Sequence, residues 1–268
     1  MKIVSFNVNS VRLRLHQLKV IIDRHDPEFI GLQETKVQDH EFPVEAINDL
    51  GYEVIFMGQK THYGVALLSK TKAIKAVYGF PNDAEDAQKR FIGGEFEVNG
   101  EIIHCYNGYF PQGESEHHET KFPAKRKFYA DLSNFLQGID AAQKVIVIGD
   151  YNIAPVDEDI GIGADNAKRW LKAGKASFLP EERDWFQRII DLGYCDSFRR
   201  CYPNVPDQFS WFDYRSKGFD REPRRGLRID HLLVSQPLHD KIEDSGIDAD
   251  IRGMEKPSDH APAWLKLQ

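Results

Sequence analysis

Polar side chains that could carry out chemistry follow an apolar run near the middle of this sequence. Residues 145–148 are β-branched, a composition typical of a strand buried on both faces, and they lead through Gly149 to Asp150 and Asn152. A carboxylate binds a cation or accepts a proton, whereas an amide donates a hydrogen bond without adding charge. On an extended backbone, residues two apart point the same way, so both groups are expected to face one site. The alternative is an Asx turn that merely closes the strand.

Further candidates occupy the same kind of position. Each stands at or within one turn of the end of a predicted strand, and strand ends at one edge of a sheet stack are a natural location for a site. Taken singly, each has a plainer explanation, since carboxylates at strand ends are usually solvated and a lone histidine is usually a surface group. The set comprises Asn7, Glu34, Asp150, Asn152, Asp230, Asp259 and His260.

These candidates offer oxygen donors and no thiolate. Carboxylates with amides favour Mg²⁺, with Mn²⁺ as the alternative, over Zn²⁺. Because Mg²⁺ keeps few protein ligands and binds phosphate oxygens, the donor set indicates phosphoester chemistry. Cys105, Cys195 and Cys201 have no CxxC spacing and an odd count, so we expect reduced thiols and neither a disulfide framework nor a zinc site.

The composition is that of a soluble globular protein. The 268 residues are 41% hydrophobic and 29% charged, which is enough for an ordinary core. A formal net charge of −7 excludes a protein that coats nucleic acid through bulk charge, yet it allows local basic loops around an acidic, metal-filled site. No apolar run approaches the roughly 18 residues of a membrane span, and no signal peptide precedes the first strand, so a cytoplasmic location is expected.

Strands and helices follow one another without a linker or a low-complexity segment, so residues 1–268 are predicted to form a single domain. Many strands in two runs, with helices between and after them, predict an α/β fold of two packed sheets flanked by helices. Residues 111–115 are expected to form an irregular loop, and residues 215–225 a long basic loop. The predicted strands are 2–9, 29–34, 53–57, 65–69, 91–98, 101–109, 145–148, 209–214, 227–234 and 261–267, and the predicted helices are 14–25, 121–136, 166–173 and 180–192.

Several segments resemble the signature segments of the endonuclease/exonuclease/phosphatase superfamily, in the expected order from residue 2 to residue 264. Residues 211–215 narrow the resemblance to the bacterial exonuclease III branch of the AP endonuclease family. The resemblance implies a four-layer α/β sandwich, in which two mixed β-sheets pack face to face and are flanked by helices, together with a divalent metal. The segments are LQETK (32–36), NGYFPQG (107–113), GDYNIAP (149–155), RID (228–230) and SDHAP (258–262).

The resemblance implies a DNA-repair phosphodiesterase with three activities. These are 3′→5′ exonuclease on double-stranded DNA, abasic-site endonuclease, and 3′-phosphatase or 3′-repair diesterase, leaving a 3′-hydroxyl and a 5′-phosphate. The implied partner is double-stranded DNA with abasic sites or 3′ ends, with no membrane, no obligate protein partner and a monomeric state. Two other classes remain: a superfamily phosphatase acting on a small or lipid phosphoester, and a catalytically silent DNA-binding module. The silent module is disfavoured because every site residue is present.

The resemblance also implies a role for each site residue. Asp150 would deprotonate the attacking water, and Asn152 would hold that water or a phosphoryl oxygen. His260, oriented by Asp230, would donate a hydrogen bond to the phosphate, and the Tyr109 phenol would contact the scissile phosphate or the leaving oxygen. The implied metal ligands are Asn7, Glu34, Asp150, Asn152 and Asp259, with Glu34 as the principal carboxylate.

DNA contacts are expected from the loops. The resemblance implies that Trp211, with Phe209 or Phe212 nearby, lines a pocket for a flipped-out sugar that lacks its base; the alternative for Trp211 is a core tryptophan on a short strand. Two basic runs would lie along the duplex or would simply be solvated helix faces. The predicted contacts are Gln112, Gly113, Lys121, Trp211, Phe212 and Arg215, and the basic runs are Lys121, Lys125, Arg126 and Lys127, and Lys168, Arg169, Lys172 and Lys175.

His231 departs from the pattern of the resemblance, in which an aliphatic residue commonly follows the aspartate. On a strand, His231 would face away from Asp230, so we expect consequences for packing and none for the chemistry. Ser10 also departs, because it stands where a glycine is frequent. The basic loop at 219–225 would change the grip on DNA, which leaves the balance of exonuclease and endonuclease activity open.

Overall fold

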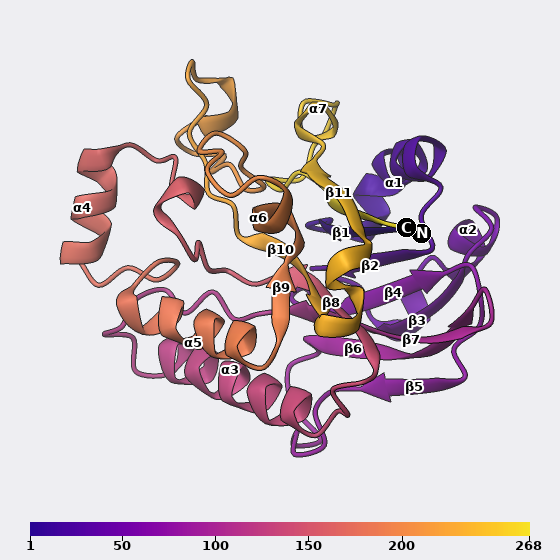
Figure 1. Cartoon of the computed structure of the whole chain (residues 1–268). Helices are drawn as coiled ribbons and strands as arrows, with labels where there is room; N and C mark the ends of the chain where they lie inside the picture. Colours follow the sequence, from indigo (N-terminus) through magenta and orange to yellow (C-terminus); the bar gives the residue numbers. More distant parts are fainter.

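The computed structural model describes residues 1–268 and contains two six-stranded β-sheets that pack face to face (Figure 1). The first sheet consists, in spatial order, of β11 (Ile242–Ile247), β12 (Ala263–Leu267), β1 (Lys2–Asn7), β2 (Phe29–Gln33), β4 (Val65–Ser69) and β3 (Glu53–Met57). Strands β1 and β2 are parallel, and every other neighbouring pair is antiparallel. The sheet is therefore mixed, with its parallel pair at the centre.

The second sheet follows the same plan. It consists, in spatial order, of β5 (Lys75–Tyr78), β6 (Phe91–Val98), β7 (Glu101–Tyr109), β8 (Lys144–Asp150), β10 (Asp230–Ser235) and β9 (Tyr194–Asp196). Strands β7 and β8 form the parallel pair, and the other pairs are antiparallel. Asn99 and Gly100, both at positive φ, form the tight turn between β6 and β7 that the sequence predicts.

Helices cover the outer face of each sheet. On the first sheet lie α1 (Val11–His25), α2 (Val44–Asn48) and α7 (Ala249–Arg252), and on the second lie α3 (Lys121–Gln137) and α5 (Pro180–Asp191). Helix α4 (Ala164–Lys172) projects away from the sheets on the left of Figure 1, and α6 (Ser197–Cys201) packs against β10 and β11. Short 3₁₀ turns are η1 (Asp39–Glu41), η2 (Asp157–Asp159), η3 (Gly218–Asp220) and η4 (Gln236–Lys241). No helix combines the length and the apolar character needed to span a bilayer.

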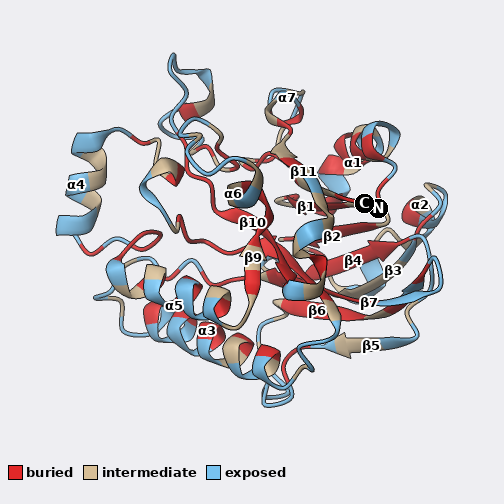
Figure 2. Ribbon diagram, viewed as in Figure 1, coloured by how far each residue is buried: buried red, intermediate tan, exposed pale blue.

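Three layers of apolar side chains separate the four layers of secondary structure. Along β8, Val145 and Val147 face α3 and α5, whereas Ile146 and Ile148 face the first sheet. Because both faces of β8 are covered, its β-branched composition matches its burial. Figure 2 shows buried strands between helices whose outer faces are exposed. The predicted four-layer α/β sandwich is confirmed.

One predicted strand is wrong, and several short elements are not predicted. Residues 209–214 form no strand, since Trp211 makes only isolated bridges to Leu227 and His260. Phe209 and Phe212 in this segment are buried, so the aromatic composition reflects burial and not sheet pairing. The sequence pattern also misses β5, β9 and β11 and the short helices α2, α6 and α7, because each is short and several are rich in polar residues.

Candidate active site

The ends of strands from both sheets meet at one edge of the sandwich. Because β1 and β2 are parallel, Asn7 at the end of β1 lies beside Glu34, which directly follows β2. Strand β8 ends at Asp150, and the antiparallel register of β10 places Asp230 directly opposite it. His260 precedes β12, which runs antiparallel to β1 and so starts at the same edge. Strand direction thus brings together residues that are far apart in the chain.

Asn7 links the carboxylates of the two sheets. Its Nδ2 donates to Glu34 Oε1 (2.9 Å) and to Asp150 Oδ2 (2.9 Å), and its Oδ1 accepts the backbone N–H of Asn9 (3.0 Å). Lys36 Nζ lies 2.9 Å from the other oxygen of Glu34. A neutral amide therefore holds Glu34 and Asp150 side by side without placing a third negative charge between them.

His260 and Asp230 form a buried pair. His260 Nδ1 and Asp230 Oδ2 are 2.8 Å apart, and His260 Nε2 lies 3.7 Å from Asp150 Oδ2. Burial opposes the charged imidazole, but the carboxylates of Asp230 and Asp150 outweigh it and raise the pKa of His260 to about 10. His260 is therefore a cation at neutral pH, which makes Nε2 a proton donor and a poor metal ligand.

Asp150 differs in protonation from an ordinary aspartate. Its side chain is almost fully buried, and this burial is the main reason that its pKa rises to about 7. The negative charges of Asp230 and Glu34 act in the same direction, while the charge of His260 opposes them. Such a carboxylate is suited to accept a proton near neutral pH.

Glu34 and Asp259 behave in the opposite way. Burial raises the pKa of Glu34, but the ammonium of Lys36, the hydrogen bond from Asn7 and the charge of His260 together outweigh it and hold that pKa below its usual range. For Asp259, burial is outweighed by the charge of His260 and by hydrogen bonds that include one from Trp211 Nε1 (3.1 Å), so its pKa is also lowered. Both carboxylates stay ionised at neutral pH and can act as permanent anions.

Asn152 follows β8 in a left-handed conformation, with φ 53°. Its backbone N–H donates to Asp150 Oδ1 (3.1 Å), and its Nδ2 donates to the carbonyl of Phe110 (2.9 Å). The Asx turn named as the plain alternative is thus present, and the expectation of an extended backbone through residue 152 is wrong. Asp150 and Asn152 still line one cavity, because the left-handed residue bends the chain around the Asp150 carboxylate.

Tyr109 ends β7 beside Asp150 in the parallel ladder. The guanidinium of Arg90 lies over its ring (4.6 Å to the centroid) and donates to its carbonyl (3.0 Å). Burial and the charge of Glu34 raise the pKa of Tyr109, so its phenol stays protonated and is an O–H donor. Sequence reasoning missed Arg90; its position directly before β6, the neighbour of β7, is the signal that places it here.

A cavity of about 170 Å³ lies at this edge, next to a second cavity of about 410 Å³. Gln112, Trp170 and Trp211 line both, so the cavities adjoin. The smaller one brings together Glu34, Tyr109, Gln112, Asp150, Asn152, Trp211, Asp259 and His260 from the predicted set. The larger one has cationic walls, with Lys175, Arg215, Arg221 and Arg225 among its lining residues.

Trp170 is a cavity residue that sequence reasoning missed. Its ring stacks on Phe178 (5.6 Å between centroids, planes 3° apart), and Lys175 Nζ lies 4.5 Å from its centroid. The signal is a tryptophan in α4, a helix in which no residue is fully buried. One face of the Trp170 ring therefore packs on a small apolar cluster, while the side chain also lines both cavities and is available for contact there.

Four of the residues predicted to contact DNA have side chains that are at least partly exposed and could reach a duplex. Gln112, Lys121 and Arg215 are exposed, and Lys121 Nζ donates to Glu114 Oε2 (2.6 Å). Trp211 is half-buried at the cavity wall, so it is not a core tryptophan. Gly113 is buried at φ 87°, where a Cβ would lie 2.9 Å from Lys125.

Two residues predicted to contact DNA have buried side chains in this structure. The ring of Phe212 is only 1% exposed and packs edge-on against Phe219 (5.1 Å), because its side chain points inward behind Trp211. Lys125 is fully buried and pairs with Glu182 (2.5 Å), because it lies on the apolar face of α3. Neither side chain is available to a duplex.

The donor set of the site fits a hard divalent cation. One oxygen each from Glu34 and Asp150 lie within 4.8 Å of each other, and the neighbouring ring nitrogen of His260 carries a proton and is not one of the donors. The oxygen donors that suit a divalent ion are the carboxylates of Glu34, Asp150 and Asp259. Lys36, Arg90 and His260 are the cations next to them.

A four-layer α/β sandwich with an acidic, oxygen-lined pocket at one edge defines the class of metal-dependent phosphoester hydrolases. The model of the endonuclease/exonuclease/phosphatase family matches residues 4–260. The chain is 57% identical over 269 residues to exodeoxyribonuclease III of Haemophilus influenzae, and the match covers all of both chains. The chain therefore belongs to the endonuclease/exonuclease/phosphatase family.

Solved structures agree with this assignment. The 3′ phosphatase NExo from Neisseria, bound to a product DNA hairpin, is similar with a TM-score of 0.90 and 34% identity, covering 100% of this chain and 99% of that one. An AP endonuclease from Archaeoglobus fulgidus is similar with a TM-score of 0.89 and 31% identity, again covering 100% and 99%. The resemblance drawn from the sequence segments is confirmed.

Proposed function

We propose that this chain is a divalent-metal-dependent DNA-repair phosphodiesterase of exonuclease III type. Its activities are 3′→5′ exonuclease on double-stranded DNA, endonuclease at abasic sites, and 3′-phosphatase or 3′-repair diesterase, each leaving a 3′-hydroxyl. The relatives support this combination, since one is an exodeoxyribonuclease III, one a 3′ phosphatase and one an AP endonuclease. Residues 1–268 would act as a single domain, as a monomer in the cytoplasm, with Mg²⁺ or alternatively Mn²⁺.

The observation that carries the proposal is the convergence of Glu34, Asp150 and His260 beside a cavity walled by Trp211. The three polar groups lie within 4.8 Å of one another, and Trp211 lines the cavity that they face. An anionic pair next to a cationic proton donor matches the two needs of phosphodiester hydrolysis. One is a base for water, and the other is a donor for the charge that develops on the phosphate.

Asp150 is the proposed general base. Its raised pKa lets it take the proton of an attacking water near neutral pH. Asn152, fixed by its hydrogen bond to Phe110, would hold that water or a phosphoryl oxygen. His260 Nε2–H, held in place through Asp230, would donate to the phosphate as charge develops. The Tyr109 phenol would contact the scissile phosphate or the leaving oxygen.

Glu34 is the proposed principal metal ligand, with Asp150, Asp259 and Asn152 in direct or water-mediated support. When bound, a divalent cation supplies neutralisation of the departing 3′-oxygen. Asn7 was expected to be a ligand as well. Because its amide nitrogen donates to both carboxylates while its Oδ1, the atom that could bind an ion, accepts the N–H of Asn9, we propose that Asn7 holds the ligands together.

The alternative, a phosphatase for a small or lipid phosphoester, would use the same acidic site. It gives no role to Trp211 or to the cationic walls formed by Lys175, Arg215, Arg221 and Arg225. In a polynucleotide, the phosphates on either side of the scissile bond would bind to those cationic side chains. The larger cavity therefore favours a polynucleotide.

A duplex labelled at its 5′ end and carrying one abasic site tests the proposal. We expect a nick at the lesion and shortening from the 3′ end in the presence of Mg²⁺, and neither product in the presence of a chelator. Adding Mg²⁺ in excess of the chelator should restore both the nick at the lesion and the shortening from the 3′ end. An intact duplex, together with phosphate release from a soluble phosphomonoester, would contradict the proposal in favour of the alternative.

A further inference from the structure

Three consecutive carbonyls of the turn after β8 are each bound by a different buried side chain. The Tyr151 carbonyl accepts from Tyr129 Oη (2.6 Å), and the Asn152 carbonyl accepts from Lys125 Nζ (2.8 Å). The Ile153 carbonyl lies 2.8 Å from His231 Nε2. Carbonyls of a loop next to a substrate cavity ordinarily turn to water or to backbone partners. Here all three are bound by side chains from α3 and β10.

Lys125 joins this turn to the loop that faces DNA. Its buried ammonium also donates to the carbonyl of Gln112 (3.2 Å) and to Glu182 Oε1 (2.5 Å). These three acceptors use all three N–H bonds of the ammonium, and Glu182 compensates its charge. The other oxygen of Glu182 accepts the backbone N–H groups of Ser177 (2.7 Å) and Leu179 (2.9 Å). One buried ion pair thus anchors the turn, the 110–113 loop and the start of α5.

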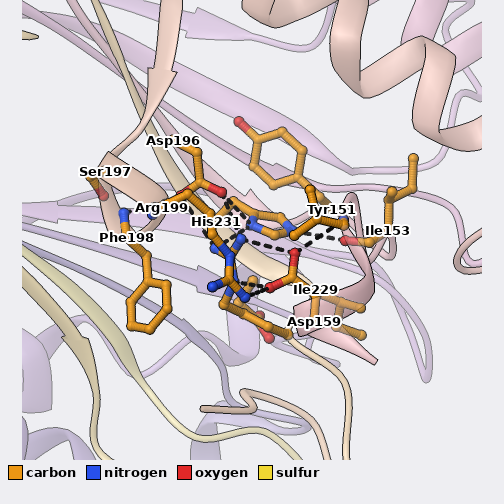
Figure 3. A network of polar contacts seen from close by, with 12 residues as sticks. Tyr151, Ile153, Asp159, Asp196, Ser197, Phe198, Arg199, Ile229 and His231 are labelled. Atoms are coloured by element: carbon orange, nitrogen blue, oxygen red, sulfur yellow. Dashed lines mark hydrogen bonds and ion pairs between the residues drawn. The ribbon is translucent and has the colours of Figure 1, made fainter. Parts of the chain in front are cut away.

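His231 anchors the same turn through the carbonyl of Ile153 (Figure 3). Because a carbonyl only accepts, His231 Nε2 carries the hydrogen, and Nδ1 is left to accept from Arg228 Nη1 (2.9 Å). Arg228 is fully buried and binds the carboxylates of Asp159 (2.6 Å) and Asp196 (2.7 Å). An aliphatic residue at position 231 offers neither contact. The predicted packing consequence of His231 therefore reaches the backbone next to Asn152.

We propose that Tyr129, Lys125 and His231 are positioning residues for the reaction, acting through the backbone of the Tyr151–Asn152–Ile153 turn. Asn152 adopts φ 53°, a left-handed conformation that asparagine adopts more readily than most residues, and the carbonyls of residues 151–153 are all held by side chains. With the carbonyls bound from behind, the N–H and side chain of Asn152 are directed to Asp150 and to the cavity. This inference rests on the proposed function, because it concerns the geometry of that same site.

Tyr129→Phe is the decisive variant, since it removes one hydroxyl and leaves the ring. We expect kcat on the abasic duplex to fall about threefold or more, the size of one lost hydrogen bond, while KM stays within twofold. The matched control is Tyr52→Phe, which removes a buried hydroxyl that also donates to a backbone carbonyl at 2.6 Å but lies on the far side of the first sheet. Its loss should lower Tm and leave kcat unchanged.

Two further variants extend the test to the other anchors. Lys125→Met combined with Glu182→Gln removes both charges and keeps an acceptor for Ser177 and Leu179, and we expect kcat to fall about tenfold or more. His231→Leu should lower kcat less. For all variants, the Kd for uncleaved duplex in chelator should match that of the unmodified chain.

If Tyr129→Phe lowers Tm as Tyr52→Phe does but leaves kcat unchanged, the three side chains serve folding alone and the inference is wrong. The outcome is separable from a failure of the proposed function. If the proposed function is wrong, the unmodified chain itself would not cleave the abasic duplex.

Discussion

Glu34 comes from the first sheet and Asp150 from the second, and the two carboxylates share the amide of Asn7, yet their environments drive them apart. Lys36, with Asn7 and His260, overcomes burial and holds the pKa of Glu34 below its usual range, whereas burial raises that of Asp150 to about 7. One group is a permanent anion that suits cation binding, and the other takes and releases a proton. The difference shows that residue type alone does not assign acid–base and metal roles; the surroundings of each carboxylate do.

The largest effect is expected from Asp150, at the end of a second-sheet strand, and from His260, which precedes β12 of the first sheet. Asp150→Asn removes the base, and His260→Ala removes the donor, so either should lower kcat by ~10²-fold or more. Duplex affinity measured in chelator should be nearly unchanged, because neither side chain contributes to the cationic walls. Single-turnover cleavage of the abasic duplex measures the effect. Near-normal turnover in either variant would remove that role assignment.

Glu34→Gln should give a different defect. The amide keeps the shape but loses the charge, so the Mg²⁺ concentration for half-maximal cleavage should rise about tenfold or more, with activity partly regained at high Mg²⁺. Titration of activity with the metal makes the measurement. Asp150→Asn should show no such recovery. Identical metal responses in the two variants would mean that the two sheets do not divide the roles.

Trp211 connects the substrate cavity to the first-sheet carboxylates through its bond to Asp259. Trp211→Ala should lower abasic-site cleavage about fivefold relative to 3′→5′ exonuclease activity on an undamaged duplex, since the wall of the lesion pocket is lost. Trp211→Phe keeps a ring but lacks the N–H, so its abasic-site activity should lie between that of Trp211→Ala and that of the unmodified chain. Full abasic-site activity in Trp211→Ala would show that the ring serves packing only.

The smallest effect is on the pH dependence of stability. Burial, and then the charge of Arg228, lower the pKa of His231 to about 4, against about 6.5 in an unfolded chain. The unfolded state therefore takes up the proton first, so this stabilisation is complete above pH 6.5 and is lost as pH falls toward 4. Between pH 7.5 and pH 6 the loss is roughly 1 kcal/mol.

Denaturant unfolding of His231→Leu at the two pH values isolates that contribution. The destabilisation that His231→Leu causes relative to the unmodified chain should therefore be smaller at pH 6 than at pH 7.5, by roughly 1 kcal/mol. His16→Gln, which alters an exposed histidine, is the control for the loss of one histidine from the chain. If the unfolding free energy changed equally between the two pH values in His231→Leu and in the unmodified chain, His231 would not be held neutral by the fold.

Much of the site was predictable because strand ends carry it. Asn7, Glu34, Asp150 and Asp230 each follow or begin an apolar run, and parallel and antiparallel pairing brings such ends to one edge. The local sequence allowed the turn, since an Asx turn was the stated alternative and asparagine readily adopts a left-handed φ. What the local pattern does not contain is the set of distant side chains, such as His231, that bind the carbonyls of this turn.

Lys125 shows a different limit. It stands in a run of basic residues, which indicates a solvated surface, but it also lies three residues after Phe122 and four before Tyr129, both buried on the same face of α3. The helical period therefore contained the signal for burial, and residue type concealed it. Phe212 shows a related limit. It was expected beside Trp211 at the cavity, but Trp211 faces the cavity while Phe212 points inward.

Asp230 stands opposite Asp150 in the β8–β10 ladder, and His231 opposite Gly149, with their side chains on opposite faces of the sheet. A single inserted or deleted residue in β10 would exchange those faces and put a different side chain in front of His260. Length changes in this short strand should therefore be far more damaging than changes in the 215–225 loop. Natural or engineered sequence-length variation is accordingly expected to concentrate in that loop.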